Sequence, residues 1–230
     1  MNLDFYPKSL FKLSDAYTFG VQFGEKVIKN INGRACGMPH DYGLLAQTVF
    51  NAGDGDYVET GTFYGASAII AAKIKLTFNL KGMIICIDPL EGFYGEGRKD
   101  GKTNDYPTPD KVMKNAFKFK VANKFRLITK PSYPFPDELK DKKFACAYID
   151  GDHWGDLPTK DWLNLKDRTS KYIIIDNYDA THPSVKDAAE LAITDKDWTL
   201  VHQSSISLIL EKNPVMKNTF RSGMKYEERH

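Results

Sequence analysis

Acidic and imidazole side chains collect in "YIDGDHW", Tyr148–Trp154, at the end of a hydrophobic run that is typical of a buried strand. Asp150 ends this predicted strand, and Asp176 and Asn177 end the next one, "YIIIDN". Adjacent parallel strands lie about 5 Å apart, so these oxygen-bearing side chains should converge. Two carboxylates and an amide suit a hard cation, Mg²⁺ first, with Mn²⁺ or Ca²⁺ as alternatives. The sequence therefore predicts a metal site at Asp150, Asp176 and Asn177.

A second set of residues follows the predicted strand "DYVET". Gly61 and Gly65 in "ETGTFYGAS" permit a tight turn and let a ligand approach the backbone before a helix begins. Asp88 lies roughly 20 residues further on, where a doubly wound sheet places the acid that holds a ribose. The spacing is not G-x-G-x-x-G, and no G-x-x-x-x-G-K-[ST] loop occurs. We expect a nucleoside cofactor without a bound diphosphate.

Alternating strands and helices must position these residues. Runs such as "IICI" and "YIII" are apolar at successive positions, which indicates a parallel sheet covered on both faces. The predicted strands are Asp56–Thr60, Met83–Asp88, Phe125–Thr129, Phe144–Asp150 and Tyr172–Asn177, with two more near "WTLVHQ" and "SISLILEK". Only two serines separate the last two strands, so these should form an antiparallel hairpin.

Amphipathic segments between the strands predict helices at "GASAIIAAKIKL", "KVMKNAFKFK", "DWLNLKD" and "SVKDAAELAI". His182 and Pro183 stand in start-signal positions for the last of these helices. Ahead of the sheet, Asp41 is a candidate cap for the helix "YGLLAQTVFNAG". Residues 91–109 are rich in glycine and predict a long loop.

The chain has 230 residues and 42% hydrophobic content, which is enough for one large core. We expect a single domain over 1–230, with a helical cover at 1–55, a core at 56–212 and a polar tail at 213–230. A net charge of +2 gives no reason to expect a nucleic-acid partner. Three widely spaced cysteines favour a reducing, cytoplasmic setting, and no signal peptide or membrane span is evident. The sequence leaves a homo-oligomer possible and does not settle the oligomeric state.

The segment "VETGTFYGASAIIAA" resembles motif I of class I S-adenosylmethionine-dependent methyltransferases, in the form E-x-G-x-x-x-G-x-S. Catechol-type O-methyltransferases and sugar O-methyltransferases of macrolide biosynthesis share this form, and the resemblance spans roughly residues 56–177. It implies a Rossmann-like α/β fold with a seven-stranded sheet in the order 3-2-1-4-5-7-6, six strands parallel and one antiparallel. It also implies S-adenosylmethionine as the cofactor.

Site residues follow from the resemblance by position. Glu59 and Gly61 would line the methionine side of the cofactor, Ser67 would meet its carboxylate and Asp88 would hold the ribose hydroxyls. Thr62, Gly65 and Asp150 are assigned to the same cofactor site.

The metal-dependent members of this family carry a general base three residues after the first metal-binding Asp, and here that residue is His153. An imidazole with an unperturbed pKa near ~6.5 suits removal of a hydroxyl proton at neutral pH. The expected reaction is methylation of a hydroxyl on a small molecule, a phenol or a sugar of a natural product. The sequence of residues 1–55, which usually shapes the acceptor pocket, does not say which.

Other interpretations stay open at this point. "DGD" is often a simple turn, and His153 could be a metal ligand or a surface histidine. Rival functions are a metal-independent methyltransferase on another acceptor, a nicotinamide-dependent oxidoreductase and a catalytically silent binding protein.

Aromatic residues near the predicted site could wall the substrate pocket or simply pack: Trp154, Tyr178, Phe93 and Tyr94. Lys130 and Ser132 lie where the family places the adenine, but "KPSYPFP" departs from the usual pattern, so the adenine contacts are not assigned.

Overall fold

A computed structural model describes residues 14–90, 99–100, 102–179 and 181–214. The predicted wall residues Phe93 and Tyr94 lie outside the described residues, as do all four glycines of the 91–109 loop and nearly all of the polar tail.

The core of the structure is a seven-stranded sheet in the order β3-β2-β1-β4-β5-β7-β6, as the resemblance implies. The strands are β1 (Tyr57–Thr60), β2 (Ile84–Ile87), β3 (Phe125–Ile128), β4 (Phe144–Ile149), β5 (Thr169–Ile175), β6 (Trp198–Gln203) and β7 (Leu208–Lys212). Neighbouring strands from β3 to β5 pair in parallel, whereas β7 is antiparallel to both β5 and β6. The predicted terminal hairpin is therefore confirmed.

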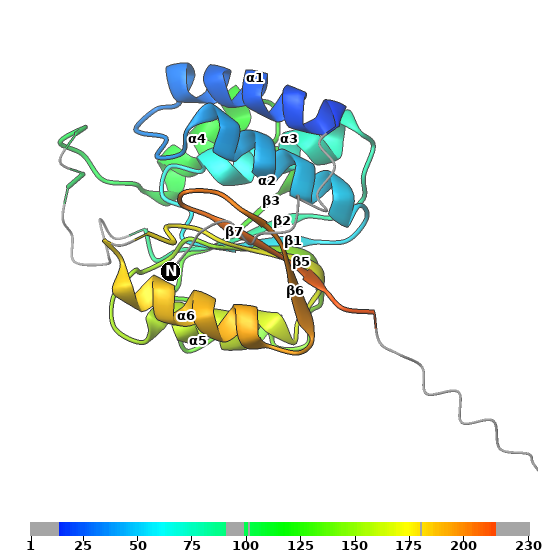
Figure 1. Ribbon diagram of the computed structural model, residues 1–230. Helices are drawn as coiled ribbons and strands as arrows, with labels where there is room; N and C mark the ends of the chain where they lie inside the picture. Colours follow the sequence, from blue (N-terminus) through cyan, green and yellow to red (C-terminus); the bar gives the residue numbers. More distant parts are fainter. Residues whose placement is uncertain (1–13, 91–98, 101, 180, 215–230) are drawn as a thin grey trace, which may run out of the picture.

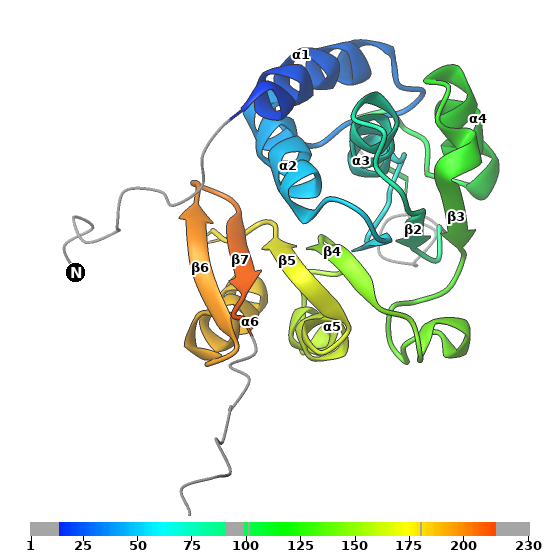
Figure 2. The same ribbon diagram turned by 90° about the vertical axis from the view of Figure 1, so that its right-hand side faces the viewer.

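Six helices cover the sheet in the described part of the chain. They are α1 (Asp15–Asn30), α2 (Pro39–Ala52), α3 (Ala66–Thr77), α4 (Pro109–Lys118), α5 (Leu157–Lys166) and α6 (Pro183–Thr194), with short 3₁₀ turns at Ala122–Lys124 and Asp137–Leu139. Helices α1 to α4 lie on one face and α5 and α6 on the other, as Figures 1 and 2 show. The predicted helical cover is present as α1 and α2, which pack against each other and against α3.

Successive strand residues point to opposite faces, so the central strands contribute side chains to two apolar clusters, one on each face of the sheet. In β1, Tyr57 packs with α2 and α3, while Val58 packs with α5 and α6 on the other side. Both residues are fully buried. This burial on two faces explains why the strand sequences are apolar at consecutive positions.

The strands end slightly earlier than predicted. Asp88, Asp150 and Asp176 fall just after β2, β4 and β5 rather than inside them. Since the last apolar residue of each strand is the last one covered by helices, the polar residue that follows is free to face the carboxyl edge of the sheet.

The predicted cap of α2 was wrong. Met38 is the N-cap residue, and Asp41 lies inside the first turn, where its carboxylate accepts the Met38 backbone N–H at 2.8 Å. Pro39 at the first helical position shifts the start towards the N-terminus because its fixed φ suits that position. In the same way, α4 and α5 begin earlier than predicted, with Pro109 and Pro158 in their first turns.

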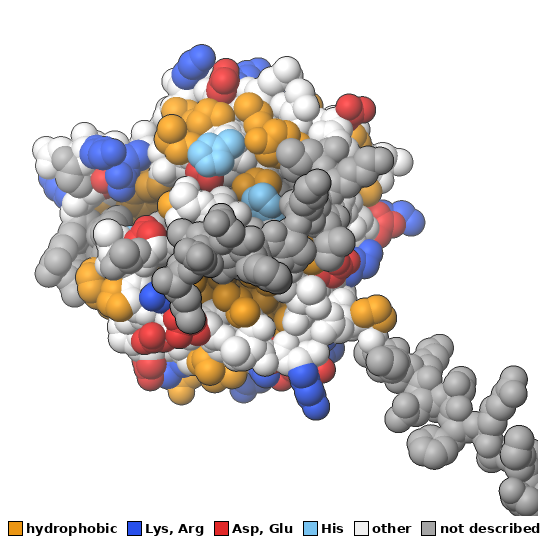
Figure 3. Space-filling view, in the orientation of Figure 1, with side chains coloured by type: hydrophobic (Ala, Val, Ile, Leu, Met, Phe, Trp, Pro, Cys, Tyr) orange, Lys and Arg blue, Asp and Glu red, His pale blue; other side chains and the backbone are white. Residues whose placement is uncertain are grey.

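None of the helices in the described residues is long and apolar enough to cross a membrane. Figure 3 shows one face of the molecule, on which basic and acidic side chains are interspersed.

Candidate active site

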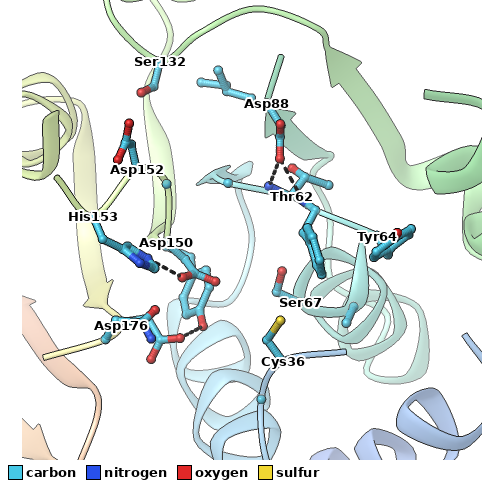
Figure 4. A pocket seen from close by; sticks show the side chains of 18 of the residues that line it. Cys36, Thr62, Tyr64, Ser67, Asp88, Ser132, Asp150, Asp152, His153 and Asp176 are labelled. Atoms are coloured by element: carbon cyan, nitrogen blue, oxygen red, sulfur yellow. Dashed lines mark hydrogen bonds and ion pairs between the residues drawn. The ribbon is translucent and has the colours of Figure 1, made fainter. Parts of the chain in front are cut away.

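A cavity of about 500 Å³ opens at the carboxyl ends of the central strands. Its lining comes from the turns after β1, β2, β4 and β5 and from residues 34–45 of the helical cover. Ligands of open parallel sheets bind at this edge, beyond the strand ends. Figure 4 shows the side chains that converge there.

On the β1–β2 side of the cavity, Asp88 organises the turn that follows β1. One carboxylate oxygen, Oδ2, accepts the backbone N–H groups of Thr62 and Phe63, each at 2.8 Å, and Oδ1 accepts that of Leu90 at 2.8 Å. Burial raises the pKa of Asp88, while these hydrogen bonds oppose the rise. Asp88 therefore fixes the turn and still borders the cavity.

Gly61 has a structural reason to be glycine. Its φ is +80°, and a Cβ there would lie 1.9 Å from the Asp150 carbonyl oxygen. The turn after β1 thus passes directly against the end of β4, which only a residue without a side chain permits.

Glu59 lies beneath the turn, away from the cavity lining, and is fully buried. Its Oε2 accepts the hydroxyls of Tyr57 at 3.0 Å and Ser67 at 2.9 Å. Burial raises the pKa of Glu59 to about 7, against the effect of these hydrogen bonds. Ser67 and Thr62 line the cavity, whereas Gly65 is the left-handed residue that precedes α3.

On the β4–β5 side, Asp150 and Asp176 follow Ile149 and Ile175, which are register partners. Asp176 accepts the Tyr148 hydroxyl at 2.8 Å and the Ser207 hydroxyl at 2.5 Å, one on each oxygen. Burial raises the pKa of Asp176, against these hydrogen bonds. Burial, with a further contribution from Asp176, raises the pKa of Asp150 to about 7, against the effect of His153. Two partly buried carboxylates thus face one cavity.

His153 also lines this side, with Nε2 at 3.4 Å from Asp150 Oδ1 and a side chain that is 14% exposed. Burial lowers its pKa, but the carboxylates of Asp150, Asp176 and Asp152 outweigh burial, so that the pKa is raised above the ordinary value. The ring of His182, which the sequence marked only as a helix-start residue, lies 4.7 Å from that of His153.

The donor set fits a hard cation. Asp150, Asp176 and Asn177 all line the cavity with oxygen donors, and the mutual repulsion of the two carboxylates would be relieved by a cation between them. Asn177 adopts φ +59°, a conformation that Asn tolerates better than most residues. Across the described ranges, no group of three or more His, Cys, Asp and Glu side chains is arranged to hold a metal ion, so the set would depend on the Asn177 amide.

Of the four aromatic residues that could wall the pocket or simply pack, the two in the described residues do not border the cavity. Trp154 is 54% exposed, and Tyr178 packs against the apolar cluster beneath the sheet. Neither borders the cavity, which is lined instead by other aromatic residues: Tyr42, Phe63, Tyr64, Tyr133 and Tyr148. Ser132 borders the cavity, whereas Lys130 pairs with Glu138 on the surface.

Sequence reasoning missed the contribution of the helical cover. Arg34, Cys36, Asp41 and Tyr42 all line the cavity, although they precede β1. No motif or spacing links them to the strand ends, and only the packing of α2 over the sheet brings them there.

Comparison with solved structures supports this description of the fold. NovP, an O-methyltransferase, superposes with a TM-score of 0.57 at 20% identity, covering 86% of this chain and 79% of that chain. TomG from Streptomyces achromogenes, an O-methyltransferase of tomaymycin synthesis solved with S-adenosylmethionine, gives 0.56 at 14% identity, covering 89% and 92%. CalS11, a TDP-rhamnose 3′-O-methyltransferase, gives 0.52 at 15% identity, covering 86% and 95%. A search of curated proteins found no match to this sequence.

The strand order and the helices around the sheet match the Rossmann-like fold of these O-methyltransferases. The family model for a methyltransferase domain matches residues 58–194, which is more than half of the chain. The protein therefore belongs to this methyltransferase family.

Proposed function

We propose that the protein transfers a methyl group from S-adenosylmethionine to a hydroxyl of a small molecule, a phenol or a sugar of a natural product, with the help of a divalent cation, Mg²⁺ first. The observation that carries the proposal is the meeting of Asp88, Asp150 and His153 in one cavity. In the proposed roles of ribose-binding acid, metal-binding acid and base, the three residues would act on ligands in the same cavity, which all of them line.

In this proposal the β1–β2 side binds the cofactor. Asp88 faces the ribose, with one acceptor position on Oδ1 left after its backbone hydrogen bonds. Thr62 and Ser67 border the methionine end, while Glu59 supports Ser67 from below. When bound, S-adenosylmethionine supplies an electrophilic methyl group on a sulfonium.

The β4–β5 side prepares the acceptor. Asp150, Asp176 and Asn177 would hold the cation, which supplies Lewis acidity and orients the acceptor oxygen. His153 takes the hydroxyl proton and is stabilised as an imidazolium by Asp150 at 3.4 Å. The Tyr148 and Ser207 hydroxyls hold Asp176 in place. Proximity of the two reacting groups supplies much of the rate enhancement.

The first test needs no knowledge of the acceptor. Titration calorimetry with S-adenosylhomocysteine, with Mg²⁺ and again after chelation, should show binding in the presence of Mg²⁺. Absence of binding under both conditions would contradict the cofactor proposal. Binding that is identical in affinity and in heat under both conditions would leave the cofactor intact and weigh against a coupled metal.

The base is tested separately, with an acceptor found by screening phenols and sugars. His153→Ala should retain S-adenosylhomocysteine binding and lose methyl transfer by a factor of about 100 or more. Full activity of this variant would show that another group takes the proton.

A further inference from the structure

The ring of His153 is carried by a connection without regular structure. Residues 150–156, between β4 and α5, form only bends and turns. Within this connection His153 Nε2 lies 3.4 Å from Asp150 Oδ1, longer than the roughly 2.7–3.2 Å that is usual for a hydrogen bond from nitrogen. A contact with a second, more rigid segment would therefore help to fix the orientation of this ring.

His182, from the connection between β5 and α6, supplies such a contact. The centres of the His182 and His153 rings are 4.7 Å apart and their planes are inclined by 70°, which is an edge-to-face arrangement. The Trp154 ring, next in sequence to His153, lies 6.4 Å from His182 at 62°. His182 does not border the cavity, and its side chain is 22% exposed. It therefore meets His153 from outside the cavity.

The backbone of His182 is fixed by the start of α6. His182 is the N-cap residue, and its carbonyl oxygen accepts the backbone N–H groups of Val185 and Lys186, each at 3.1 Å. The side chain of an N-cap residue often accepts a helix N–H as well. The imidazole caps none of the described N–H groups of α6. The backbone is thus anchored, while the ring takes part in other contacts.

The ring of His182 is held by its own loop. Its Nδ1 lies 3.2 Å from Asp179 Oδ1 and 3.0 Å from Thr181 Oγ1. The same carboxylate oxygen accepts the Thr181 backbone N–H at 2.7 Å and the Thr181 hydroxyl at 2.5 Å. Because a carboxylate oxygen accepts hydrogen bonds, the Nδ1 of His182 carries the proton. Backbone and ring of His182 are therefore both fixed.

We propose that His182 is a positioning residue for the base: its ring, packed against that of His153, keeps Nε2 of His153 directed to Asp150 and the cavity. Figure 4 shows His153 pointing towards Asp150 in this way. The inference rests on the proposed function and adds to it a residue that acts only through His153. Such a contact matters because displacement of a reacting group by about 1 Å can cost about 100-fold in rate.

Two substitutions of His182 separate this role from that of a helix-start residue. His182→Phe keeps a ring to pack on His153 but loses the Nδ1–H group. His182→Asn loses the ring but keeps an N–H group for Asp179 and is a favourable N-cap residue. If His182 only begins α6, the asparagine variant should be the more active of the two.

The positioning role predicts the opposite order. With the acceptor found by screening, His182→Phe should keep kcat within about three-fold of the wild type, whereas His182→Asn should lower kcat by about ten- to a hundred-fold. In both variants KM and the affinity for S-adenosylhomocysteine should change by less than about three-fold, because His182 does not border the cavity. His202→Asn is the matched control: His202 is a partly buried histidine on β6, outside the cavity lining, and its loss should leave kcat unchanged.

Nuclear magnetic resonance of wild-type protein with ¹⁵N-labelled histidine needs no acceptor. It should show His182 protonated on Nδ1 and a nuclear Overhauser effect between the rings of His153 and His182. Absence of this effect would overturn the inference even if neither variant folds.

The contrary results are distinct. Wild-type kcat in His182→Asn, or equal losses in the asparagine and phenylalanine variants, would show that ring packing does not position the base. Wild-type protein that does not bind S-adenosylhomocysteine, or full activity of His153→Ala, would instead overturn the proposed function on which the inference rests.

Discussion

On the β1–β2 side of the cavity, the carboxylate of Asp88 accepts three backbone N–H groups, each at 2.8 Å. On the β4–β5 side, the carboxylates meet side chains instead: Asp176 accepts two hydroxyls, and Asp150 faces the ring of His153. Backbone donors are fixed by the fold, whereas side-chain donors can rotate. The geometry on the β1–β2 side is therefore fixed by the backbone, whereas that on the β4–β5 side depends on the orientation of side chains.

The protonation properties of the two sides fit this contrast. Burial raises the pKa of Asp150 to about 7, with a contribution from Asp176, and the carboxylates raise the pKa of His153 against the effect of burial. The pKa of Asp150 therefore lies near neutral pH, and that of His153 lies above its ordinary value.

The largest expected effect comes from the glycine that joins the two sides. Gly61→Ala would place a Cβ 1.9 Å from the Asp150 carbonyl at φ +80°, so we expect a loss of about 3 kcal/mol or more in the free energy of unfolding. S-adenosylhomocysteine binding should be lost as well. Urea denaturation and calorimetry measure the two effects.

Gly155→Ala is the matched control for this prediction. Gly155 also has a positive φ, +63°, but a Cβ there has no neighbour within 4 Å. Only the backbone cost of about 1 kcal/mol should remain. Similar losses for the two variants would mean that the contact between the turn and β4 carries little of the stability.

Asp88→Asn tests the fixed geometry of the β1–β2 side. The amide keeps one acceptor oxygen but turns an NH₂ group towards backbone N–H donors, so stability should fall by about 1–3 kcal/mol. Binding of S-adenosylhomocysteine should weaken by about ten-fold or more. Asp152→Asn is the control. Asp152 accepts one backbone hydrogen bond, from Trp154 at 3.0 Å, so this variant should change stability and S-adenosylhomocysteine affinity little. An unchanged affinity in Asp88→Asn would contradict the ribose assignment.

Asp176→Asn tests the cation assignment on the β4–β5 side. Electron paramagnetic resonance of free Mn²⁺ should show one bound ion in the wild-type protein and an affinity at least about ten-fold weaker in the variant. Asp179→Asn is the control, because Asp179 follows in the same loop but pairs with His182 outside the cavity lining. Equal Mn²⁺ affinity in wild type and Asp176→Asn would contradict the assignment of Asp176 as a ligand, and no bound Mn²⁺ in the wild type would argue for a metal-independent enzyme.

A further effect should appear in the pH dependence of stability. Burial raises the pKa of Glu59 to about 7, above its ordinary value of 4.5. For an acid whose pKa is higher in the folded state, the stabilising contribution is complete below the unfolded pKa and is lost as the pH rises through the folded one. Because of Glu59, the free energy of unfolding should therefore fall as the pH rises from about 4.5 to 7, by up to roughly 1.4 kcal/mol per pH unit.

Urea denaturation at pH 5 and pH 8 measures this contribution. Glu59→Gln should show a smaller decline in stability between these pH values than the wild type. Asp161, buried behind the β4–α5 loop with a pKa raised by burial to about 6, allows the same comparison in Asp161→Asn on the other side of the cavity. A wild-type slope unchanged in Glu59→Gln would mean that Glu59 is already charged at pH 5.

Local sequence information determined much of the fold. Alternation of apolar segments predicted the strands, and the prolines and glycines that begin or precede helices were visible, although Pro39 moved the start of α2 away from Asp41. The turn after β1 could be predicted because it needs glycines at two nearby positions, Gly61 and Gly65, and these are visible in the sequence. The order of the strands was available only through the resemblance to a family, since periodicity says nothing about which strands are neighbours.

The sequence by itself placed Asp150, Asp176 and Asn177 at strand ends and Asp88 after β2. In each case the change from apolar to polar residues marks the carboxyl end of the strand. Only the tertiary structure brought Arg34 over the turn beside Phe63, and only it revealed which carboxylates are buried enough for their pKa values to rise. The physical reason is range: turns and periodicity depend on neighbours in the chain, whereas desolvation and ion pairing depend on groups that packing brings together from distant segments.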